Sequence, residues 1–308
     1  MTGFWLPVQG ESSYIDTGLR GERPERTAHC NVKFTGPRNT RGTLLDIDIA
    51  AYSARIGVDG PLPPSAETLR RLHYAHMLAV PFENLDIHWG RPIVLEEGRL
   101  FEKLVTRRRG GFCYEHNGLF AAVLRELGFS VELLEARVGA KAWEGGLPWD
   151  HLTLLVALKE RWLVDVGFGD GFREPLLLDD AGPQTRAEGI WRVQHDGCEG
   201  RHSSRTAAGD WKPEYRFRLR PRRLADFKPG CDYHQHSPES HFTQQRMCSL
   251  ATETGRITLS DRCLIVTEGF PSRATANDKK GDARRKERDL ADEAEFQQVL
   301  RERFGIVP

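Results

Sequence analysis

The stretch from Arg107 to Phe120, RRRGGFCYEHNGLF, contains the side chain best suited to act as a nucleophile. Cys113 follows two glycines and stands where a helical pattern begins. A helix N-terminus stabilises negative charge, which favours the reactive thiolate form of a cysteine, and the three preceding arginines add positive charge nearby. We expect Gly110 and Gly111 to let a substrate approach the backbone closely. A free cysteine can also be a small buried residue, so Cys113 indicates catalysis only in company with suitable partners.

Two downstream residues are suitable partners for this thiol. His151 begins the apolar run HLTLLVAL, and Asp165 lies between apolar neighbours in the strand-like run RWLVDVGFG. A carboxylate in such a strand is costly unless it is hydrogen-bonded or paired. If the two runs are adjacent strands, Asp165 can orient the imidazole of His151, which then serves as the base for the thiol. His116 ranks below His151 because it points along the same helix as the cysteine instead of across a cleft.

The elements that must position these residues change character along the chain. Helical periodicity predicts helices that begin near Leu44, Ser65, Gly98 and Cys113, and a last one after Leu290. Short β-rich runs separated by turn residues predict strands that begin at Phe129, His151, Arg161, Ile190, Tyr215 and Arg256. The polar segment GCEGRHSSRTAAGD and the charged segment between Thr267 and Leu290 are predicted to be loops.

This order of elements predicts an α+β fold. We expect a disordered extension over residues 1–43, a helical module with the nucleophile over 44–128, a β-barrel module over 129–232 and a mixed α/β module over 233–308. The extension is rich in Gly, Arg, Thr and Pro and shows no sustained period.

Composition excludes several classes of function. The 308 residues include 44 basic and 44 acidic side chains, so the formal net charge of zero gives no electrostatic basis for binding nucleic acid or an anionic membrane. No apolar run reaches transmembrane length, and the first residues lack the pattern of a secretory signal. The six cysteines are scattered without a CxxC pair, which predicts a reduced, cytoplasmic protein.

Several motifs together resemble the arylamine N-acetyltransferases. They are VPFENLDI at 80–87, RRRGGFCYEHNGLF at 107–120, DHLTLLV at 150–156, WLVDVGFGD at 162–170 and SPESHFT at 237–243. Their order and spacing agree from about residue 44 to the C-terminus. The resemblance implies a papain-like core with a Cys113–His151–Asp165 triad, a helical module, a β-barrel module and an α/β lid. It does not explain residues 1–43.

The activity that this resemblance implies is acetyl transfer by a ping-pong mechanism. Cys113 would take the acetyl group of acetyl-CoA as a thioester and pass it to an arylamine, arylhydrazine or hydrazide. Acetyl-CoA is then a substrate, and no permanently bound cofactor or metal is implied. The main alternative is a thiol hydrolase or transglutaminase-like enzyme with the same triad. A small aromatic pocket and a C-terminal lid argue against it, because excluding water protects an acyl-enzyme from hydrolysis.

The resemblance also implies binding residues. Phe82, Val138 and Phe168 would line the acceptor-amine pocket, where aromatic side chains suit a flat aryl ring. Gly169 would leave room for the thiol arm of CoA. The oxyanion hole would use backbone N–H groups, including that of Cys113.

Three other patterns are weaker. GFGDGF at 167–172 either cradles the CoA pyrophosphate through its N–H groups or forms a tight turn. CDYHQH at 231–236 offers too few well-separated ligands for zinc. His73 and His76 lie three apart on a predicted helix without a carboxylate-bearing motif, which indicates ordinary helix residues.

Overall fold

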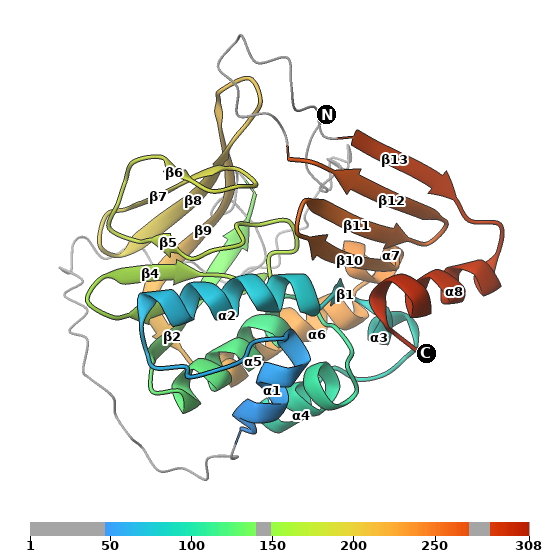
Figure 1. Cartoon of the computed structure of the whole chain (residues 1–308), viewed down its shortest axis with the longest axis horizontal. Helices are drawn as coiled ribbons and strands as arrows, with labels where there is room; N and C mark the ends of the chain where they lie inside the picture. Colours follow the sequence, from blue (N-terminus) through green and yellow to red (C-terminus); the bar gives the residue numbers. More distant parts are fainter. Residues whose placement is uncertain (1–46, 140–148, 271–283, 308) are drawn as a thin grey trace, which may run out of the picture.

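A computed structural model describes residues 47–139, 149–270 and 284–307. The extension predicted to be disordered, residues 1–43, lies outside the described residues. Figure 1 shows helices gathered together beneath two separate β-sheets. Because both sheets are antiparallel and the helices are largely segregated from them, the predicted α+β class is confirmed.

Four helices form the part of the fold that carries Cys113. They are α1 (Ile49–Ile56), α2 (Ala66–Ala79), α4 (Glu97–Phe101) with a following π-helical turn (Glu102–Thr106), and α5 (Cys113–Glu126). Ser65 is the N-cap of α2, as predicted, and its hydroxyl accepts a hydrogen bond from the Thr68 N–H at 3.2 Å. Gly128 follows α5 with a φ of 86°, a conformation that favours glycine. These local signals explain why the helix positions could be predicted.

The larger sheet forms a nearly closed antiparallel barrel. Its strands are β2 (Ser130–Val138), β3 (His151–Ala157), β4 (Arg161–Val164), β5 (Leu176–Leu177), β6 (Gln184–Thr185), β7 (Ile190–His195), β8 (Glu199–Arg205) and β9 (Trp211–Arg222). Their order in the sheet is β5-β4-β3-β2-β9-β8-β7-β6, so β5 and β6 are the edges. The side-chain amide of Gln184 joins these edges, because it accepts from the Leu177 N–H and donates to the Leu177 carbonyl, both at 2.8 Å. One amide therefore continues the hydrogen-bond ladder across the seam.

The smaller sheet joins a strand of the helical part to the C-terminal strands. It contains, in spatial order, β1 (Phe82–Glu83), β10 (Met247–Thr252), β11 (Gly255–Ser260), β12 (Cys263–Glu268) and β13 (Arg284–Asp289). Helix α8 (Glu293–Phe304), which was predicted, shares one buried cluster with this sheet through Phe296, Leu300 and Leu259. Because β1 precedes the Cys113 helix and pairs with β10, the helical part is tied directly to the C-terminal part.

Short helices connect the main elements. They are α3 (Leu85–His88), a 3-10 turn (Leu224–Phe227), α6 (Lys228–His236) and α7 (His241–Gln244). Helices α6 and α7 were not predicted, because each is short and rich in polar residues. The expected boundary between residues 232 and 233 falls inside α6, and the three-module division of the chain stays a prediction.

Two segments that were predicted to be loops contain strands. The polar segment 197–210 includes β8, and the charged segment includes β13, while residues 271–283 lie outside the described residues. β8 pairs with β7 on one side and β9 on the other, so backbone pairing defines it without an apolar pattern. β13 is an edge strand whose side chains are all exposed, and charged residues are typical of edges that must not pair with another chain.

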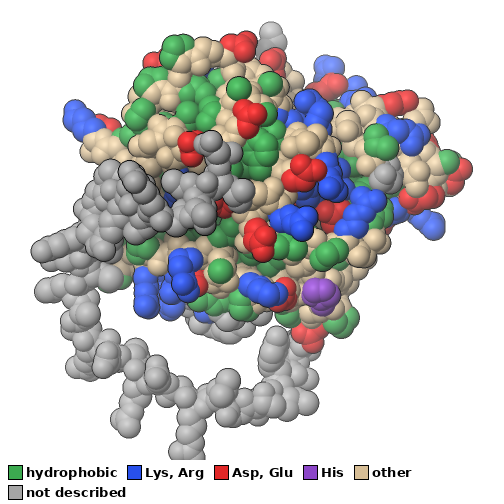
Figure 2. All heavy atoms as spheres, turned by 90° about the horizontal axis from the view of Figure 1, so that it is seen from below, with side chains coloured by type: hydrophobic (Ala, Val, Ile, Leu, Met, Phe, Trp, Pro, Cys, Tyr) green, Lys and Arg blue, Asp and Glu red, His purple; other side chains and the backbone are tan. Residues whose placement is uncertain are grey.

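The described surface carries both signs of charge. On the face seen in Figure 2, basic and acidic side chains are interspersed instead of forming a field of one sign. Among the described residues, none of the helices has both the length and the apolar character needed to cross a membrane.

Gln184→Leu should destabilise the fold, because it leaves the N–H and carbonyl of Leu177 without their partner at the barrel seam. A fully buried polar group that loses its hydrogen bond costs about 1–3 kcal/mol, and these bonds are part-buried, so we expect the free energy of unfolding to fall by about 1–3 kcal/mol in urea titrations. The exposed neighbour in β6 provides the matched control, Thr185→Ala, which should change little. Equal stabilities for Gln184→Leu and the control would show that the seam bonds are dispensable.

Candidate active site

The two glycines before Cys113 allow close packing of the protein on itself. A Cβ atom at Gly110 would lie 2.0 Å from the carbonyl oxygen of Pro81, and one at Gly111 would lie 2.6 Å from the Glu115 carboxylate. Protein atoms therefore fill the space, and the prediction that these glycines admit a substrate to the backbone is wrong. They bring the chain ahead of α5 against β1.

The arginines before Cys113 are engaged elsewhere or face solvent. Arg109 is buried, and its guanidinium pairs with Glu83 at 2.6 Å and with Asp86 at 3.0 Å. The Arg107 side chain is 67% exposed. The positive charge that the sequence places near the thiol is thus neutralised by ion pairs or solvated, and activation of the thiol depends on other groups.

The Cys113 thiol is buried, and its sulfur lies 4.0 Å from the carbonyl oxygen of Asp150. Burial raises the pKa of this thiol well above its ordinary value, although the Leu152 backbone N–H acts in the opposite direction. The position of Cys113 at a helix start predicted a lowered pKa, because that reasoning left out the desolvation of the thiolate. A thiolate that forms together with an imidazolium carries no net charge, so proton transfer to a histidine is the favourable route to ionisation.

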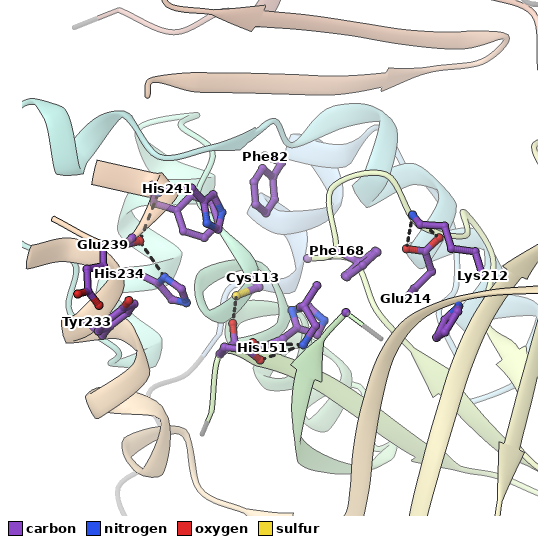
Figure 3. A pocket seen from close by; sticks show the side chains of 17 residues that line it. Phe82, Cys113, His151, Phe168, Lys212, Glu214, Tyr233, His234, Glu239 and His241 are labelled. Carbon is purple, nitrogen blue, oxygen red and sulfur yellow. Dashed lines mark hydrogen bonds and ion pairs between the residues drawn. The ribbon is translucent and has the colours of Figure 1, made fainter. Parts of the chain in front are cut away.

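His151 is the first residue of β3 and lies beside Cys113 in the pocket shown in Figure 3. Its Nε2 atom is 2.7 Å from Oδ2 of Asp165. Strands β3 and β4 are antiparallel neighbours, which meets the condition for pairing His151 with Asp165, and Asp165 follows the last residue of β4 instead of lying within the strand. An imidazole that donates from Nε2 keeps Nδ1 as its basic nitrogen, so this pairing sets the tautomer of His151.

Asp165 has no exposed surface, yet its carboxylate is well satisfied. Burial raises its pKa, but the charge and hydrogen bond of His151 and the hydrogen bonds from Asn117 and the Gly167 N–H outweigh burial and lower it. The last two donate to Oδ1 at 2.9 Å and 3.0 Å. The carboxylate is therefore charged at neutral pH and can hold the imidazole in place.

Asn117 was not predicted as a site residue, although it links the elements of the site. Its Nδ2 donates to Asp165 and to the Leu152 carbonyl, the latter at 2.6 Å, and its Oδ1 accepts from the Val166 N–H at 3.0 Å. One buried amide thus ties α5 to the segments that carry both His151 and Asp165. The available signal was its position one helical turn after the cysteine.

His116 belongs to a separate buried chain of hydrogen bonds. Its Nε2 lies 3.0 Å from the Pro81 carbonyl, its Nδ1 lies 2.9 Å from His76 Nε2, and His76 Nδ1 lies 2.8 Å from the Tyr52 hydroxyl. Burial lowers the pKa of both rings and keeps them neutral, and the Pro81 carbonyl can only accept, so each hydrogen bond is donated in the direction from Tyr52 to Pro81. Burial lowers the pKa of His116 to about 4. Both nitrogens of His116 are engaged, which leaves none to serve as a base.

A pocket of about 470 Å³ opens at Cys113 and His151 (Figure 3). Phe82, Val138 and Phe168, expected from the family resemblance to contact the acceptor, all line it. Gly169 lines a smaller adjoining pocket of about 60 Å³, which shares Phe82 and Phe168 with the larger one. The structure therefore brings the expected site residues to one continuous region.

The opposite wall of the pocket comes from residues that were not predicted. They belong to α6, α7 and the turn between them: Tyr233, His234, Glu239, Ser240, His241 and Phe242. Phe242 stands near Phe82, with ring centroids 6.2 Å apart, so the pocket has aromatic walls on both sides. No periodic pattern identifies such short helices, which is why this wall could not be assigned from sequence.

The GFGDGF segment behaves as a packed turn. A Cβ atom at Gly167 would lie 2.8 Å from the Cα atom of Cys113, and the Asp170 N–H donates to the Phe168 carbonyl at 3.1 Å. The segment thus closes against the start of α5. The part of the chain that the structure describes contains no group of three or more His, Cys, Asp or Glu residues placed to hold a metal ion.

Comparisons with known proteins agree with this fold. Residues 65–307 match a family described as N-acetyltransferase. The chain is 41% identical over 231 residues to the arylamine N-acetyltransferase of Mycolicibacterium smegmatis, covering 72% of this chain and 83% of that protein. It is 36% identical over 262 residues to the arylamine N-acetyltransferase of Escherichia coli K12, covering 83% and 87%.

Solved structures give the same assignment. The arylamine N-acetyltransferase of Salmonella typhimurium superposes with a TM-score of 0.75 at 32% identity, covering 84% of this chain and 90% of that one. The Mycobacterium marinum enzyme in complex with CoA gives 0.73 at 33% identity, covering 84% and 93%. The chain belongs to the arylamine N-acetyltransferase family.

Asp150 should make the stability of the protein depend on pH. Burial raises the pKa of this carboxyl to about 7, although hydrogen bonds from the Val138 N–H oppose the shift. The protonated form is favoured in the folded state, so its stabilisation is present below the unfolded pKa near 4 and is lost as pH rises through about 7. Asp150→Asn cannot ionise, and its stability relative to the wild type should therefore be greater at pH 8 than at pH 5.

A pKa that moves from 3.8 to about 7 corresponds to at most about 4 kcal/mol. Partial exposure of Asp150 reduces the expected change to about 1–3 kcal/mol, measured by urea unfolding at the two pH values. Asp289→Asn in the exposed strand β13 is the matched control and should show no such change. The same stability difference between Asp150→Asn and the wild type at both pH values would contradict the assignment.

Proposed function

We propose that this chain transfers an acetyl group from acetyl-CoA to arylamines, arylhydrazines or hydrazides through a thioester on Cys113. The observation that carries the proposal is the buried Asp165–His151 pair, with its 2.7 Å hydrogen bond, next to a thiol that lines an aromatic pocket. The family assignment supports the same reaction. His151 acts as the base and Asp165 orients it.

The first half-reaction transfers the acetyl group from acetyl-CoA to Cys113. The proton of Cys113 moves to Nδ1 of His151, and the thiolate attacks the carbonyl carbon of acetyl-CoA. A bond forms between the Cys113 sulfur and that carbon, the bond from the carbon to the CoA sulfur breaks, and CoA leaves with the proton held by His151. Because thiolate and imidazolium form together, burial opposes this step much less than it opposes a lone thiolate.

The second half-reaction transfers the acetyl group from Cys113 to the amine. The amine nitrogen attacks the thioester carbon, a carbon–nitrogen bond forms, and the bond to the Cys113 sulfur breaks. His151 takes one proton from the nitrogen and returns it to the sulfur, so the enzyme regains its starting state. The same nucleophile serves both halves, which gives ping-pong kinetics.

The pocket walls support an aromatic acceptor. Phe82, Phe168 and Phe242 present ring faces and edges, and Val138 adds an aliphatic surface to the same space. A flat aryl ring gains buried area and offset stacking there. Gly169 lines the adjoining pocket, which supports its proposed role of leaving room for the thiol arm of the donor. The thioester forms on a residue that is only 4% exposed, which favours transfer over hydrolysis.

The chain is also expected to work in a reducing compartment, which agrees with a cytoplasmic location. The cysteines that the structure describes, Cys113, Cys198, Cys231, Cys248 and Cys263, are all free thiols. Disulfides are rare where glutathione and thioredoxin keep thiols reduced.

Intact-protein mass spectrometry tests the proposal directly. After mixing with acetyl-CoA, the protein should gain one acetyl group on Cys113, and an arylamine such as an anisidine should remove it as the acetylated amine forms. The Cys113→Ser variant should gain none, because a serine hydroxyl beside this base stays protonated. An acetyl group that disappears equally fast without the amine would favour a thiol hydrolase. An unmodified wild-type protein would contradict acetyl transfer from acetyl-CoA.

Asp165→Asn should lower kcat by roughly 10³–10⁴-fold. Asn117 and the Gly167 N–H both donate to Oδ1, so the amide oxygen must take that position and the amide NH₂ must face His151. His151 then accepts at Nε2 and carries its proton on Nδ1, which removes the base. The control Asp179→Asn breaks an exposed pair with Arg161 and should leave kcat unchanged. A near-normal rate in Asp165→Asn would give Asp165 a structural role only.

A further inference from the structure

A second histidine faces the nucleophile from the wall of the pocket that the C-terminal part supplies. His234 lies on α6, lines the larger pocket and is only 6% exposed. In Figure 3 its imidazole stands between α6 and Cys113. The pair of His151 and Asp165 lies on the β3–β4 side of the pocket, so the two histidines approach the thiol from different sides.

The position of the His234 ring is fixed by the residues next to the nucleophile. Its centroid lies 6.4 Å from the ring of Phe112 and 6.2 Å from that of Tyr114, the two chain neighbours of Cys113. Phe242 meets the same ring edge-on at 5.1 Å. These contacts place the imidazole beside the first turn of α5.

The hydrogen bonds of His234 determine which nitrogen carries the proton. Its Nδ1 lies 3.0 Å from the hydroxyl oxygen of Ser240, which also accepts from the Phe242 N–H at 3.3 Å. The buried Ser240 hydroxyl has no other acceptor among the described residues, so its proton goes to Nδ1. Nε2 of His234 therefore carries an N–H group.

This N–H group has no hydrogen bond of normal geometry among the described residues, although the Asp150 carbonyl contacts the ring. The Cys113 sulfur lies 4.0 Å from that same carbonyl oxygen. A buried N–H without a well-formed hydrogen bond is unfavourable, which calls for a ligand that satisfies it.

We propose that His234 donates a hydrogen bond from Nε2 to the acetyl oxygen while the acetyl carbon is bonded to Cys113. That oxygen becomes negative when the thiolate attacks acetyl-CoA and again when the amine attacks the thioester. A donor fixed in advance stabilises this charge in both steps. The proposal rests on the proposed acetyl transfer, and it adds a side-chain donor to the backbone N–H groups expected from the sequence.

A neutral imidazole suits this role. Burial, followed by the charge of His241, lowers the pKa of His234 to about 4, so the ring stays neutral at physiological pH. It then offers one N–H without adding a cation that would compete with His151 for the thiolate. Neutral imidazoles act as electrophiles in the same way in other enzymes.

His234→Phe provides the test, because phenylalanine keeps a flat ring among Phe112, Tyr114 and Phe242 but has no donor. We expect acetylation of Cys113 by acetyl-CoA, followed by rapid quench and mass spectrometry in a single turnover, to slow by roughly 10²–10³-fold. Transfer from the acetyl-enzyme to anisidine should slow by a similar factor. Alkylation of Cys113 by iodoacetamide forms no oxyanion and should change less than about threefold.

Two further variants separate a hydrogen-bond role from a packing role. His236→Phe replaces an exposed histidine of the same helix and should react like the wild type. His234→Gln restores an N–H near the position of Nε2, and it should keep acetylation within about tenfold of the wild type. Circular dichroism confirms that each variant is folded before its rates are compared.

The outcomes are distinct. Acetylation of folded His234→Phe within threefold of the wild type overturns the proposal. Alkylation that slows as much as acetylation also overturns the proposal, because the substitution would then act on formation of the thiolate and not on the acetyl oxygen. If His234→Phe does not fold, a folded Gln variant that is slowed 10²-fold or more overturns it too. A wild-type protein that acetyl-CoA does not acetylate would instead refute the proposed function, and this role of His234 with it.

Discussion

The charged carboxylate of Asp165, which has no exposed surface, is the constraint on which the rest of the site depends. A buried charge is tolerated only when hydrogen bonds replace its lost water. Here His151, Asn117 and the Gly167 N–H provide them, and they come from β3, α5 and the turn after β4. Satisfying one carboxylate therefore fixes three separate segments relative to one another. The orientation of the base follows from this arrangement without any contact to substrate.

The helix ends, the His151–Asp165 pair and several pocket residues could be predicted from sequence, because each is marked by its own residue type and its near neighbours in the chain. Ser65 and Gly128 mark helix ends, and a histidine at the start of one apolar run with an aspartate near the end of the next indicates a pair across adjacent strands. The family motifs also surround the residues that line the pocket. In each case the residue type and its immediate neighbours carried the information, so no knowledge of the distant fold was needed.

The remaining features depend on contacts between distant segments. Gln184 closes the barrel through a backbone partner seven residues away, and nothing in its surroundings distinguishes it from a surface glutamine. Gly110 faces Pro81 instead of a substrate, which only the packing of β1 reveals. His234 sits in a short polar helix, and its role arises from the fold that brings α6 against α5. The pKa of the thiol was misjudged for the same reason, since desolvation depends on the whole surrounding structure.

The hydrogen-bond chain that runs from Tyr52 through His76 and His116 to Pro81 links a helix outside the pocket to the pocket wall. Pro81 immediately precedes Phe82, whose ring stacks over His116 at 6.2 Å. The position of the Phe82 ring in the pocket wall thus depends partly on Tyr52 of α1, which is not among the residues that line the pocket. Substitutions in this hydrogen-bond chain can therefore change the selectivity for acceptor amines, although the substituted residues do not contact the substrate. Two members of the family with identical pocket residues need not prefer the same amines.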